Sequence, residues 1–385
     1  MTMRTLLTRF RFIYLFVVFF AFLWACDEDE VRWKPDRGGE NIEEGENTDD
    51  PELVDPEDPT DLEDPTDPED PTDPEDPVDE WEHVSIAVIS DLNASYGSTS
   101  YSSVVKDAIT HIIASKPDIV LSAGDMVAGQ RSGLDYASMW RAFHFNVSDR
   151  LFDENIPFLI VPGNHDAARD EERIHYENAW KDRVPPFEML AGSRFPFYYA
   201  IMVEGILIIA LDIVRVAGID TLQLEWLNDT LRNNVHVRQR IVIGHLPLAA
   251  VALAKISEIV ISTTLEEALR EQGVEFYISG HHHAYYPAHL GELRHVSMPC
   301  LGSGPRPLMG STQTAWRGYV WIDIPPKGPA QVSAYKAPSF ENKQVLEELP
   351  TTIGRLERED IGLANYILEW LDSSIHRASK SLGNR

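Results

Sequence analysis

The sequence around which the chain is organised is Ile156-Pro157-Phe158-Leu159-Ile160-Val161, followed by Pro162-Gly163-Asn164-His165-Asp166. The first six residues form an apolar run, which predicts a buried strand. The Pro162-Gly163 pair ends the strand and places three polar side chains at its carboxyl end. An asparagine oxygen binds hard cations, a histidine binds a metal or transfers a proton, and an aspartate fixes the tautomer of a histidine. Taken alone, the same residues also fit a polar turn.

The same pattern, an apolar run that ends in a residue able to bind a metal, recurs along the chain. The other runs, with the polar residues that follow them, are Val84 to Ser90 with Asp91, Asp118 to Ala123 with Asp125, Ile206 to Leu211 with Asp212, Ile241 to Ile243 with His245, and Phe276 to Ser279 with His281 and His283. Amphipathic stretches at 103–116 and 221–233 predict helices between the strands. Strands that alternate with helices predict an α/β layered domain, in which sites lie outside the carboxyl ends of the strands.

These strand ends together indicate a metal site, although each has a simpler explanation by itself. Asp125 fits a turn, His245 fits a hydrogen-bonded core histidine, and the triplet His281-His282-His283 fits a surface tract. Six segments that end in such residues at one edge favour a shared site over separate accidents. Carboxylate, amide and imidazole ligands suit Fe, Mn or Zn, and the two cysteines of the chain form no cluster that would indicate a structural zinc site.

The first 26 residues have the pattern of a targeting segment. Arg4, Arg9 and Arg11 precede an apolar run of 14 residues, from Phe12 to Ala25, which has the length of a signal-peptide core and is short for a membrane span. The run ends in Leu23-Trp24-Ala25-Cys26, which resembles a bacterial lipobox and implies a lipid attached to Cys26. We therefore expect an exported protein, anchored by lipid to the bacterial cell envelope and facing the periplasm or the surface. An ordinary cleaved signal and an uncleaved anchor are the alternatives.

Residues 27–80 have the composition of a linker. They contain 26 acidic and 3 basic residues, which account for most of the net charge of −29. Glu-Asp-Pro-Thr recurs with a period of six, beginning at Glu57, Glu63 and Glu69. High charge and frequent proline prevent the formation of a core, so we expect an extended, solvated spacer that holds the domain away from a membrane. Calcium binding by the acidic residues is the alternative.

The folded domain is expected over residues 81–340, followed by a helical C-terminal extension over residues 341–385. Residues 81–385 carry 36 acidic and 27 basic side chains, so the domain is mildly acidic and nucleic-acid binding is not expected. An amphipathic helix is predicted from Glu357 to Arg377, with an apolar side formed by Leu363, Ile367, Leu371 and Ile375. This helix packs on the domain or forms a dimer contact, and the oligomeric state stays open.

The order of the polar motifs resembles the calcineurin-like metallophosphoesterase family, which includes purple acid phosphatases and cyclic-nucleotide phosphodiesterases. The family pattern is D-x-H, G-D, G-N-H-D or G-N-H-E, a lone histidine, and G-H-x-H. This chain has, in the same order, Asp91-Leu92-Asn93, Gly124-Asp125, Gly163-Asn164-His165-Asp166, Gly244-His245 and Gly280-His281-His282-His283. The resemblance covers residues 84–290 and implies a two-sheet αββα sandwich that hydrolyses phosphate monoesters or diesters.

The resemblance also implies two divalent metal ions, which could be Mn, Fe, Zn or Mg, bridged by Asp125 and by a hydroxide that attacks phosphorus. The implied ligands of one ion are Asp125, Asn164, His245 and His281, and those of the other are Asp91, Asp125 and His283. His165 is implied to stabilise the transferring group or to protonate the leaving oxygen, with Asp166 orienting it. His282 is expected to face away, because side chains alternate along an extended segment.

Two departures from the family pattern weaken the pocket of the first motif. Asn93 stands where the family has histidine, so it is either a weaker ligand or leaves the position to water. Ala128 stands where purple acid phosphatases have the tyrosine that binds iron, which argues against that pairing. We therefore expect one metal to bind tightly and the other, Mn²⁺ or Mg²⁺, to exchange easily.

Arg131 and Arg169 are candidate substrate-binding residues, because each lies a few positions from an expected ligand and arginine binds phosphate oxygens in a fork. Ordinary surface arginines are the alternative. A second reading of the whole chain is a surface-tethered binding protein on a phosphoesterase scaffold that has lost catalysis. Retention of both His165 and Asp166 favours the enzyme, because a simple binding site needs no proton donor there.

Overall fold

The computed structural model describes residues 81–361 of the 385-residue chain. The predicted signal segment with Cys26, the linker at 27–80 and most of the predicted C-terminal helix lie outside the described residues. None of the helices in the described part of the chain is long and apolar enough to cross a membrane.

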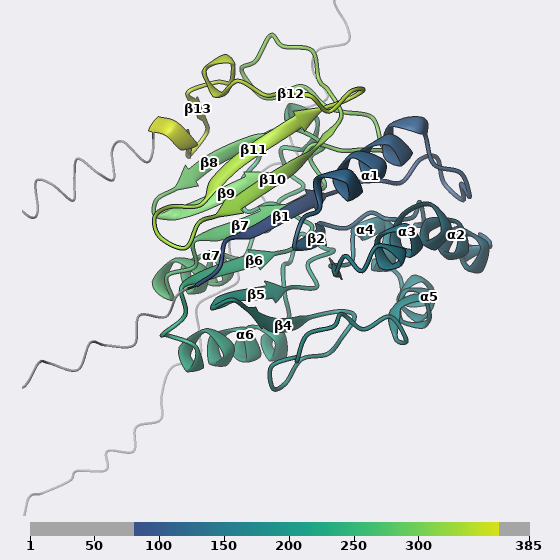
Figure 1. The fold of residues 1–385 in the computed structure, drawn as a ribbon, viewed down its shortest axis with the longest axis horizontal. Helices are drawn as coiled ribbons and strands as arrows, with labels where there is room; N and C mark the ends of the chain where they lie inside the picture. Colours follow the sequence, from purple (N-terminus) through teal and green to yellow (C-terminus); the bar gives the residue numbers. More distant parts are fainter. Residues whose placement is uncertain (1–80, 362–385) are drawn as a thin grey trace, which may run out of the picture. The chain divides into compact units, whose positions relative to one another are not determined.

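Two mixed β-sheets form the centre of the domain (Figure 1). The first sheet has the strand order β12-β11-β10-β1-β2-β3 and the second has the order β13-β14-β8-β9-β7-β6-β5-β4. Strands of the first sheet are β1 Val84–Ile89, β2 Ile119–Ser122, β3 Phe158–Ile160, β10 Gly318–Ile324, β11 Gln331–Lys336 and β12 Asn342–Lys343. Strands of the second are β4 Tyr199–Val203, β5 Ile206–Ala210, β6 Gln239–Ile243, β7 Phe276–Ser279, β8 Tyr286–Leu290, β9 Leu293–Ser297, β13 Thr352–Ile353 and β14 Leu356–Arg358.

The strands that precede the polar motifs run parallel to one another in each sheet. β1, β2 and β3 are parallel neighbours in the first sheet, and β5, β6 and β7 are parallel neighbours in the second. Parallel strands end at the same edge of a sheet, so the residues that follow them are brought together. β9 also runs parallel to β7, whereas the other pairs, β1 with β10 and β4 with β5 among them, are antiparallel and were not expected from the sequence.

Helices cover the outer faces of both sheets, which gives four layers. The elements are α1 Ser103–Ser115, α2 Tyr136–Phe143, α3 Asp149–Asp153, α4 Asn164–Ala167, α5 Asp170–Trp180, α6 Thr221–Asn233 and α7 Thr263–Glu271, with a π-helix at His144–Ser148 and 3₁₀ turns at Leu253–Lys255 and Leu346–Glu348. Buried residues of α1, α2 and α5 share a core with one face of the first sheet, whereas α6 and α7 pack with the second sheet.

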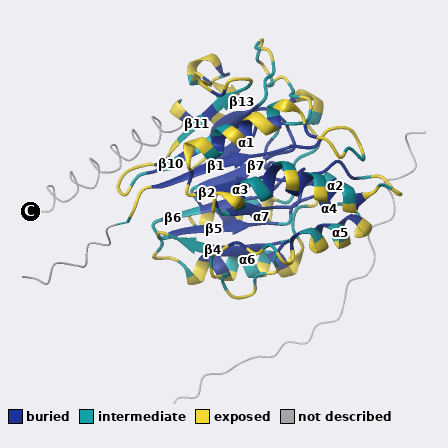
Figure 2. Ribbon diagram, turned by 45° about the vertical axis from the view of Figure 1, so that its right-hand side comes forward, coloured by how far each residue is buried: buried dark blue, intermediate teal, exposed yellow. Residues whose placement is uncertain are grey.

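Alternation along β1 shows how the layers separate. Ile86 and Val88 belong to the core between the sheets, whereas Ala87 and Ile89 belong to the core beneath the helices. Successive side chains of a strand point to opposite faces, so a strand covered on both sides is apolar throughout. Figure 2 shows both sheets buried and the outer surfaces of the helices exposed. The predicted α/β fold with two sheets is confirmed.

The structure differs from the prediction at the C-terminal boundary. Residues 342–358 were assigned to a helical extension, but β12 pairs with β11 and β14 pairs with β8. Glu357 and Arg358 therefore lie in a strand, and helical structure begins at Glu359. The edge of each sheet offers unpaired main-chain groups to this segment, which helix periodicity in the sequence does not reveal.

Candidate metal centre

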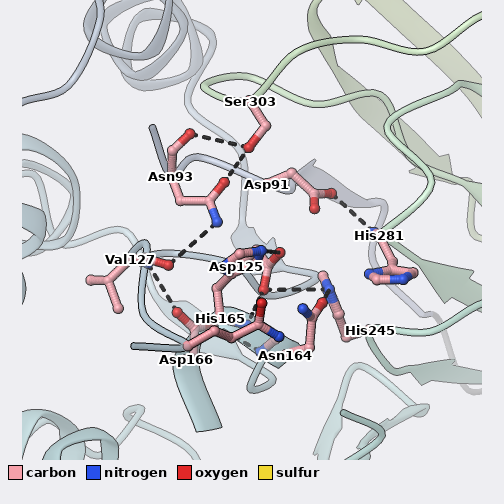
Figure 3. Close-up of polar contacts among 12 residues, drawn as sticks. Asp91, Asn93, Asp125, Val127, Asn164, His165, Asp166, His245, His281 and Ser303 are labelled. Carbon is pink, nitrogen blue, oxygen red and sulfur yellow. Dashed lines mark hydrogen bonds and ion pairs between the residues drawn. The ribbon is translucent and has the colours of Figure 1, made fainter. Parts of the chain in front are cut away.

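The polar residues that follow the strands form two overlapping groups. One group is Asp125, His245 and His281, and the other is Asp91, Asp125 and His283. All five side chains are buried, and within each group the atoms available to a cation lie within 4.8 Å of one another. Figure 3 shows Asp125 between Asp91 on one side and Asn164 with His245 on the other. Because Asp125 belongs to both groups, its carboxylate would serve both of two cations held there.

Unusual backbone conformations aim these side chains into the pocket. Left-handed φ angles occur at Asp91 (52°), Asp125 (55°), His281 (63°) and His283 (52°). Such angles are uncommon for residues other than glycine and persist where the surrounding structure enforces them. Gly163 is required nearby, because a Cβ atom there would overlap the main chain and the carboxylate of Asp125. Sharp turns thus bring the ends of separate strands close enough to share a cation.

The Asp91 carboxylate and the His283 ring face each other in a way that fits a metal ion. Asp91 Oδ2 accepts hydrogen bonds from Ser90 Oγ (2.6 Å) and from the His281 main-chain N–H (3.1 Å). Asp91 Oδ1 is buried without a hydrogen bond and lies 2.9 Å from His283 Nε2. His283 Nδ1 donates to Gly304 O (2.9 Å), so the neutral ring has its lone pair at Nε2. Two lone pairs therefore converge, as they do around a bound cation.

The surroundings of His245 show that the pocket favours positive charge. Burial would lower the pKa of His245, but the negative charges of Asp125 and Asp91 raise it to about 9. His245 Nδ1 donates to Ala123 O (2.7 Å), and Nε2 lies 2.9 Å from Asn164 Oδ1 and 3.4 Å from Asp125 Oδ1. A cation among these three side chains would satisfy the same requirement for positive charge. The donor set of carboxylate, amide and imidazole suits a transition-metal ion or Mg²⁺.

Asn93 lies beside the second group, but other protein atoms hold both ends of its amide. Its Oδ1 accepts a hydrogen bond from Ser303 Oγ, and its Nδ2 donates to Val127 O (3.4 Å). Figure 3 shows the side chain between Ser303 and Val127. An amide oxygen engaged in this way is a weaker donor to a cation than the histidine of the family pattern. The second group is therefore limited to three strong donors among the described residues.

The structure contradicts the predicted contact between Asp166 and the ring of His165. The buried Asp166 carboxylate accepts hydrogen bonds from the main-chain N–H groups of Met126, Val127 and Gly163, at 2.9 to 3.2 Å. His165 Nδ1 is buried without a hydrogen bond, and its Nε2 lies 3.9 Å from Asp125 Oδ2. Both residues belong to the short helix α4, and consecutive residues of a helix do not face each other. Asp166 therefore joins the loops after β2 and β3.

Comparison with known proteins agrees with this geometry. A family model described as calcineurin-like phosphoesterase matches residues 84–285, which include both candidate metal-binding groups. The chain belongs to the calcineurin-like phosphoesterase family. Purple acid phosphatase 15 of Arabidopsis thaliana is 26% identical over 226 residues, or 52% of this chain and 40% of that protein. This calcineurin-like phosphoesterase thus spans less than half the length of that relative.

Two solved structures are similar to this chain. The purple acid phosphatase PPD1 from yellow lupin (Lupinus luteus) has a TM-score of 0.52 and 16% identity, covering 69% of this chain and 53% of the lupin chain. A dimetal phosphatase from Danio rerio has a TM-score of 0.48 and 14% identity, covering 66% of this chain and 95% of that chain. At such identity the lupin comparison supports the two-sheet fold of this calcineurin-like phosphoesterase.

The two predicted substrate-binding arginines of this calcineurin-like phosphoesterase lie on the side of His165. The Arg131 guanidinium lies 3.9 Å from the centre of the Tyr96 ring, which is 5.5 Å from the His165 ring. Arg169 donates to Ser132 Oγ (3.1 Å), next to Arg131 in the sequence. Within residues 81–361 neither guanidinium forms an ion pair. Their positive charges therefore remain available to an anion.

Asp212 is a strand-end residue that does not join either group. Its Oδ2 accepts from the Arg173 guanidinium at 2.6 Å, and its main-chain N–H donates to Gln223 Oε1 at 2.9 Å. Burial raises the pKa of Asp212 above its ordinary value, although Arg173 opposes that effect. Asp212 therefore anchors α5 to the second sheet. A sequence pattern cannot separate such a partner of arginine from a metal ligand.

Two residues near the pocket were not expected from the sequence. Ser303 binds Asn93, as described above, and Arg306 donates to the main-chain oxygens of His281 and His283, at 3.1 Å in both cases. Both residues lie in the segment between β9 and β10, which contains no motif of the family. They reach the pocket because β9 lies parallel to and beside β7. Only the pairing of the strands could have revealed them.

Proposed function

We propose that the protein is a phosphate-ester hydrolase that uses two divalent metal ions. The supporting observation is the pair of buried ligand groups that share Asp125, with converging lone pairs at Asp91 Oδ1 and His283 Nε2. Asp125, Asn164, His245 and His281 would hold one ion, and Asp91, Asp125 and His283 the other. When bound, such ions neutralise the charge of the ester and provide hydroxide near neutral pH. Whether the enzyme prefers monoesters or diesters would depend on which substrate groups fit next to the two ions.

His165 is proposed to interact with the substrate itself. Its side chain is 22% exposed, in contrast to the buried ligand groups, and its Nε2 is directed to the Asp125 side of the pocket. Its main-chain N–H donates to Asp125 Oδ1 (2.8 Å), which fixes the position of the residue. A histidine in this place can stabilise the transferring group or give a proton to the leaving oxygen. Arg131 and Arg169, on the same side, would bind phosphate oxygens.

Hydrolysis of p-nitrophenyl phosphate and bis-p-nitrophenyl phosphate with Mn²⁺, Zn²⁺ and Mg²⁺ tests this proposal. We expect at least one metal to support hydrolysis of at least one ester. Asp125→Ala should lose both metal and activity, whereas His165→Ala should retain metal and lose about 10²–10⁴-fold in rate. Inactivity with every metal and both esters would favour the alternative, a surface-tethered binding protein, for which the weakened position at Asn93 is the supporting feature.

We also propose that the protein is exported and anchored by lipid at Cys26. The basis is the apolar run that ends in Leu23-Trp24-Ala25-Cys26, followed by the acidic linker. In a bacterial host, fractionation should place the protein with membranes, and Cys26→Ser should move it to the soluble fraction or block its processing. Membrane association that is equal for the two proteins would contradict lipidation at this residue.

A further inference from the structure

A loop that carries none of the family motifs contacts one of the candidate metal ligands. This loop, residues 247–262, connects β6 to α7 and contains the 3₁₀ turn Leu253–Lys255. Glu258 Oε2 lies 2.9 Å from His281 Nε2, and the same oxygen lies 2.6 Å from Lys255 Nζ. The 247–262 loop thus brings a carboxylate to the outer nitrogen of a buried imidazole. Lys255 holds that carboxylate in its charged form.

The contact determines which nitrogen of His281 is free. A carboxylate can only accept, so Nε2 of the neutral ring carries the hydrogen and the lone pair lies at Nδ1. His245 and His283 show the opposite arrangement, because their Nδ1 atoms donate to Ala123 O and Gly304 O. Those two rings therefore offer Nε2 to a cation, whereas His281 offers Nδ1. If the His281 ring were in the other tautomer, its Nδ1–H would point at the cation.

His282 fastens the 247–262 loop in the position that this contact needs. Its Nδ1 accepts from the Val251 main-chain N–H (3.2 Å), and its Nε2 donates to the main-chain oxygen of Glu258 (3.1 Å). The ring is fully buried, and a neutral imidazole has the one donor and one acceptor that these partners require. The middle histidine does face away from the pocket, although the segment is turned and not extended. It binds the residue whose carboxylate reaches His281.

We propose that Glu258 and His282 are positioning residues for the metal ion held by Asp125, His245 and His281. Glu258 sets the tautomer of His281 and makes its free nitrogen more basic, and His282 holds the loop that carries Glu258. The proposal rests on the metal-dependent function proposed above, but it concerns metal affinity and does not require a particular substrate. It assigns separate tasks to the triplet: His281 and His283 face the ions, and His282 supports the ligand shell.

Metal titration of the full chain tests the proposal without an activity assay. Glu258→Ala should weaken one of two Mn²⁺-binding steps about 10- to 100-fold, measured by competition with a chelator, and should leave the other step unchanged. Glu258→Gln keeps an oxygen that accepts from Nε2, so its loss should be smaller. Glu267→Ala, at an exposed position of α7, is the matched control and should bind like wild type. Wild-type affinity at both steps in Glu258→Ala would overturn the proposal.

The tautomer of His281 can be observed directly by ¹⁵N NMR of the imidazoles in the metal-free protein. We expect hydrogen at Nε2 of His281 in wild type and a shift toward the other tautomer in Glu258→Ala. His282→Phe should keep the fold and shift the tautomer of His281 in the same way. Hydrogen at Nδ1 of His281 in wild type would contradict the proposed tautomer. Hydrolysis remains a separate result: loss of one metal in Glu258→Ala without esterase activity in wild type would support the positioning role and refute the proposed function.

Discussion

Replacement of Asp166 separates two roles that the sequence could not distinguish. The buried carboxylate accepts from three main-chain N–H groups, those of Met126, Val127 and Gly163. In Asp166→Ala these donors lose their partner, at about 1–3 kcal/mol for each buried donor that stays unsatisfied. Water that enters the space reduces this cost, so we expect a loss of at least about 3 kcal/mol in the free energy of unfolding. Asp166→Asn keeps one accepting oxygen and should lose roughly 1–3 kcal/mol.

Urea and thermal unfolding of the full chain measure this effect, with metal analysis of the same samples. For a domain of this size, about 3 kcal/mol corresponds to a fall of roughly 6 °C in Tm. Metal content should also fall, because Asp166 joins the loops that carry Asp125 and Asn164. Asp107→Asn, at an exposed position of α1, is the control and should change Tm by no more than about 1 °C.

An Asp166→Ala protein that keeps its Tm and its metal content but has lost turnover would contradict a joining role for Asp166. That outcome would assign Asp166 to the orientation of His165, as the family resemblance implies. Equal losses of stability in Asp166→Ala and Asp166→Asn would also contradict the reasoning, because the asparagine retains an acceptor for two of the three donors.

Three further predictions concern the metal pocket and the core. Asn93→His should raise retention of the exchangeable ion after dialysis, from about one towards about two ions per chain by metal analysis, because it restores an imidazole to the second group. An unchanged metal content would show that the weak donor at position 93, an amide bound to Ser303, does not limit this group. Gly163→Ala should cost roughly 1–3 kcal/mol and reduce metal content, because its Cβ overlaps Asp125; unfolding and metal analysis check both. Burial lowers the pKa of His144 to about 4, below its value near 6.5 in the unfolded chain. Its contribution to stability is therefore complete above pH 6.5 and falls by up to about 3 kcal/mol as pH drops towards 4, and His144→Gln should flatten that slope in urea titrations.

The helices and strands that were predicted correctly have clear patterns in the local sequence. The expected strand over 84–90 is β1, and the expected helix over 221–233 is α6 with the same bounds. These elements were predictable because each has an apolar periodicity and a clear end signal of its own. The edge strand β14 was not, because its partner β8 lies more than sixty residues away in the chain and a short strand has little signal of its own. The helix predicted from Glu357 therefore began two residues too early.

In the candidate site, too, some residues were predicted from the sequence and others were not. The residues of the two groups were predicted because each follows a strand, and each group combines residues that follow strands of both sheets. Asp212 follows a strand as well, yet Arg173 takes its carboxylate. Asp166 is adjacent to His165, but helix geometry turns it toward main-chain donors in another loop. At both positions the hydrogen-bond partner of the carboxylate is set by contacts in the folded chain, which the sequence does not reveal.

The Asn164-His165-Asp166 turn shows what each level of description contributes. The sequence predicts that an apolar strand ends there in residues able to bind a metal and to move a proton, because side-chain chemistry and strand ends are local properties. The packing of distant segments places Asn164 against His245, Asp166 against the loop after β2, and the Glu258 carboxylate against Nε2 of His281. Hydrogen bonds act over about 3 Å, so the partner of a buried polar group is set by how distant segments pack.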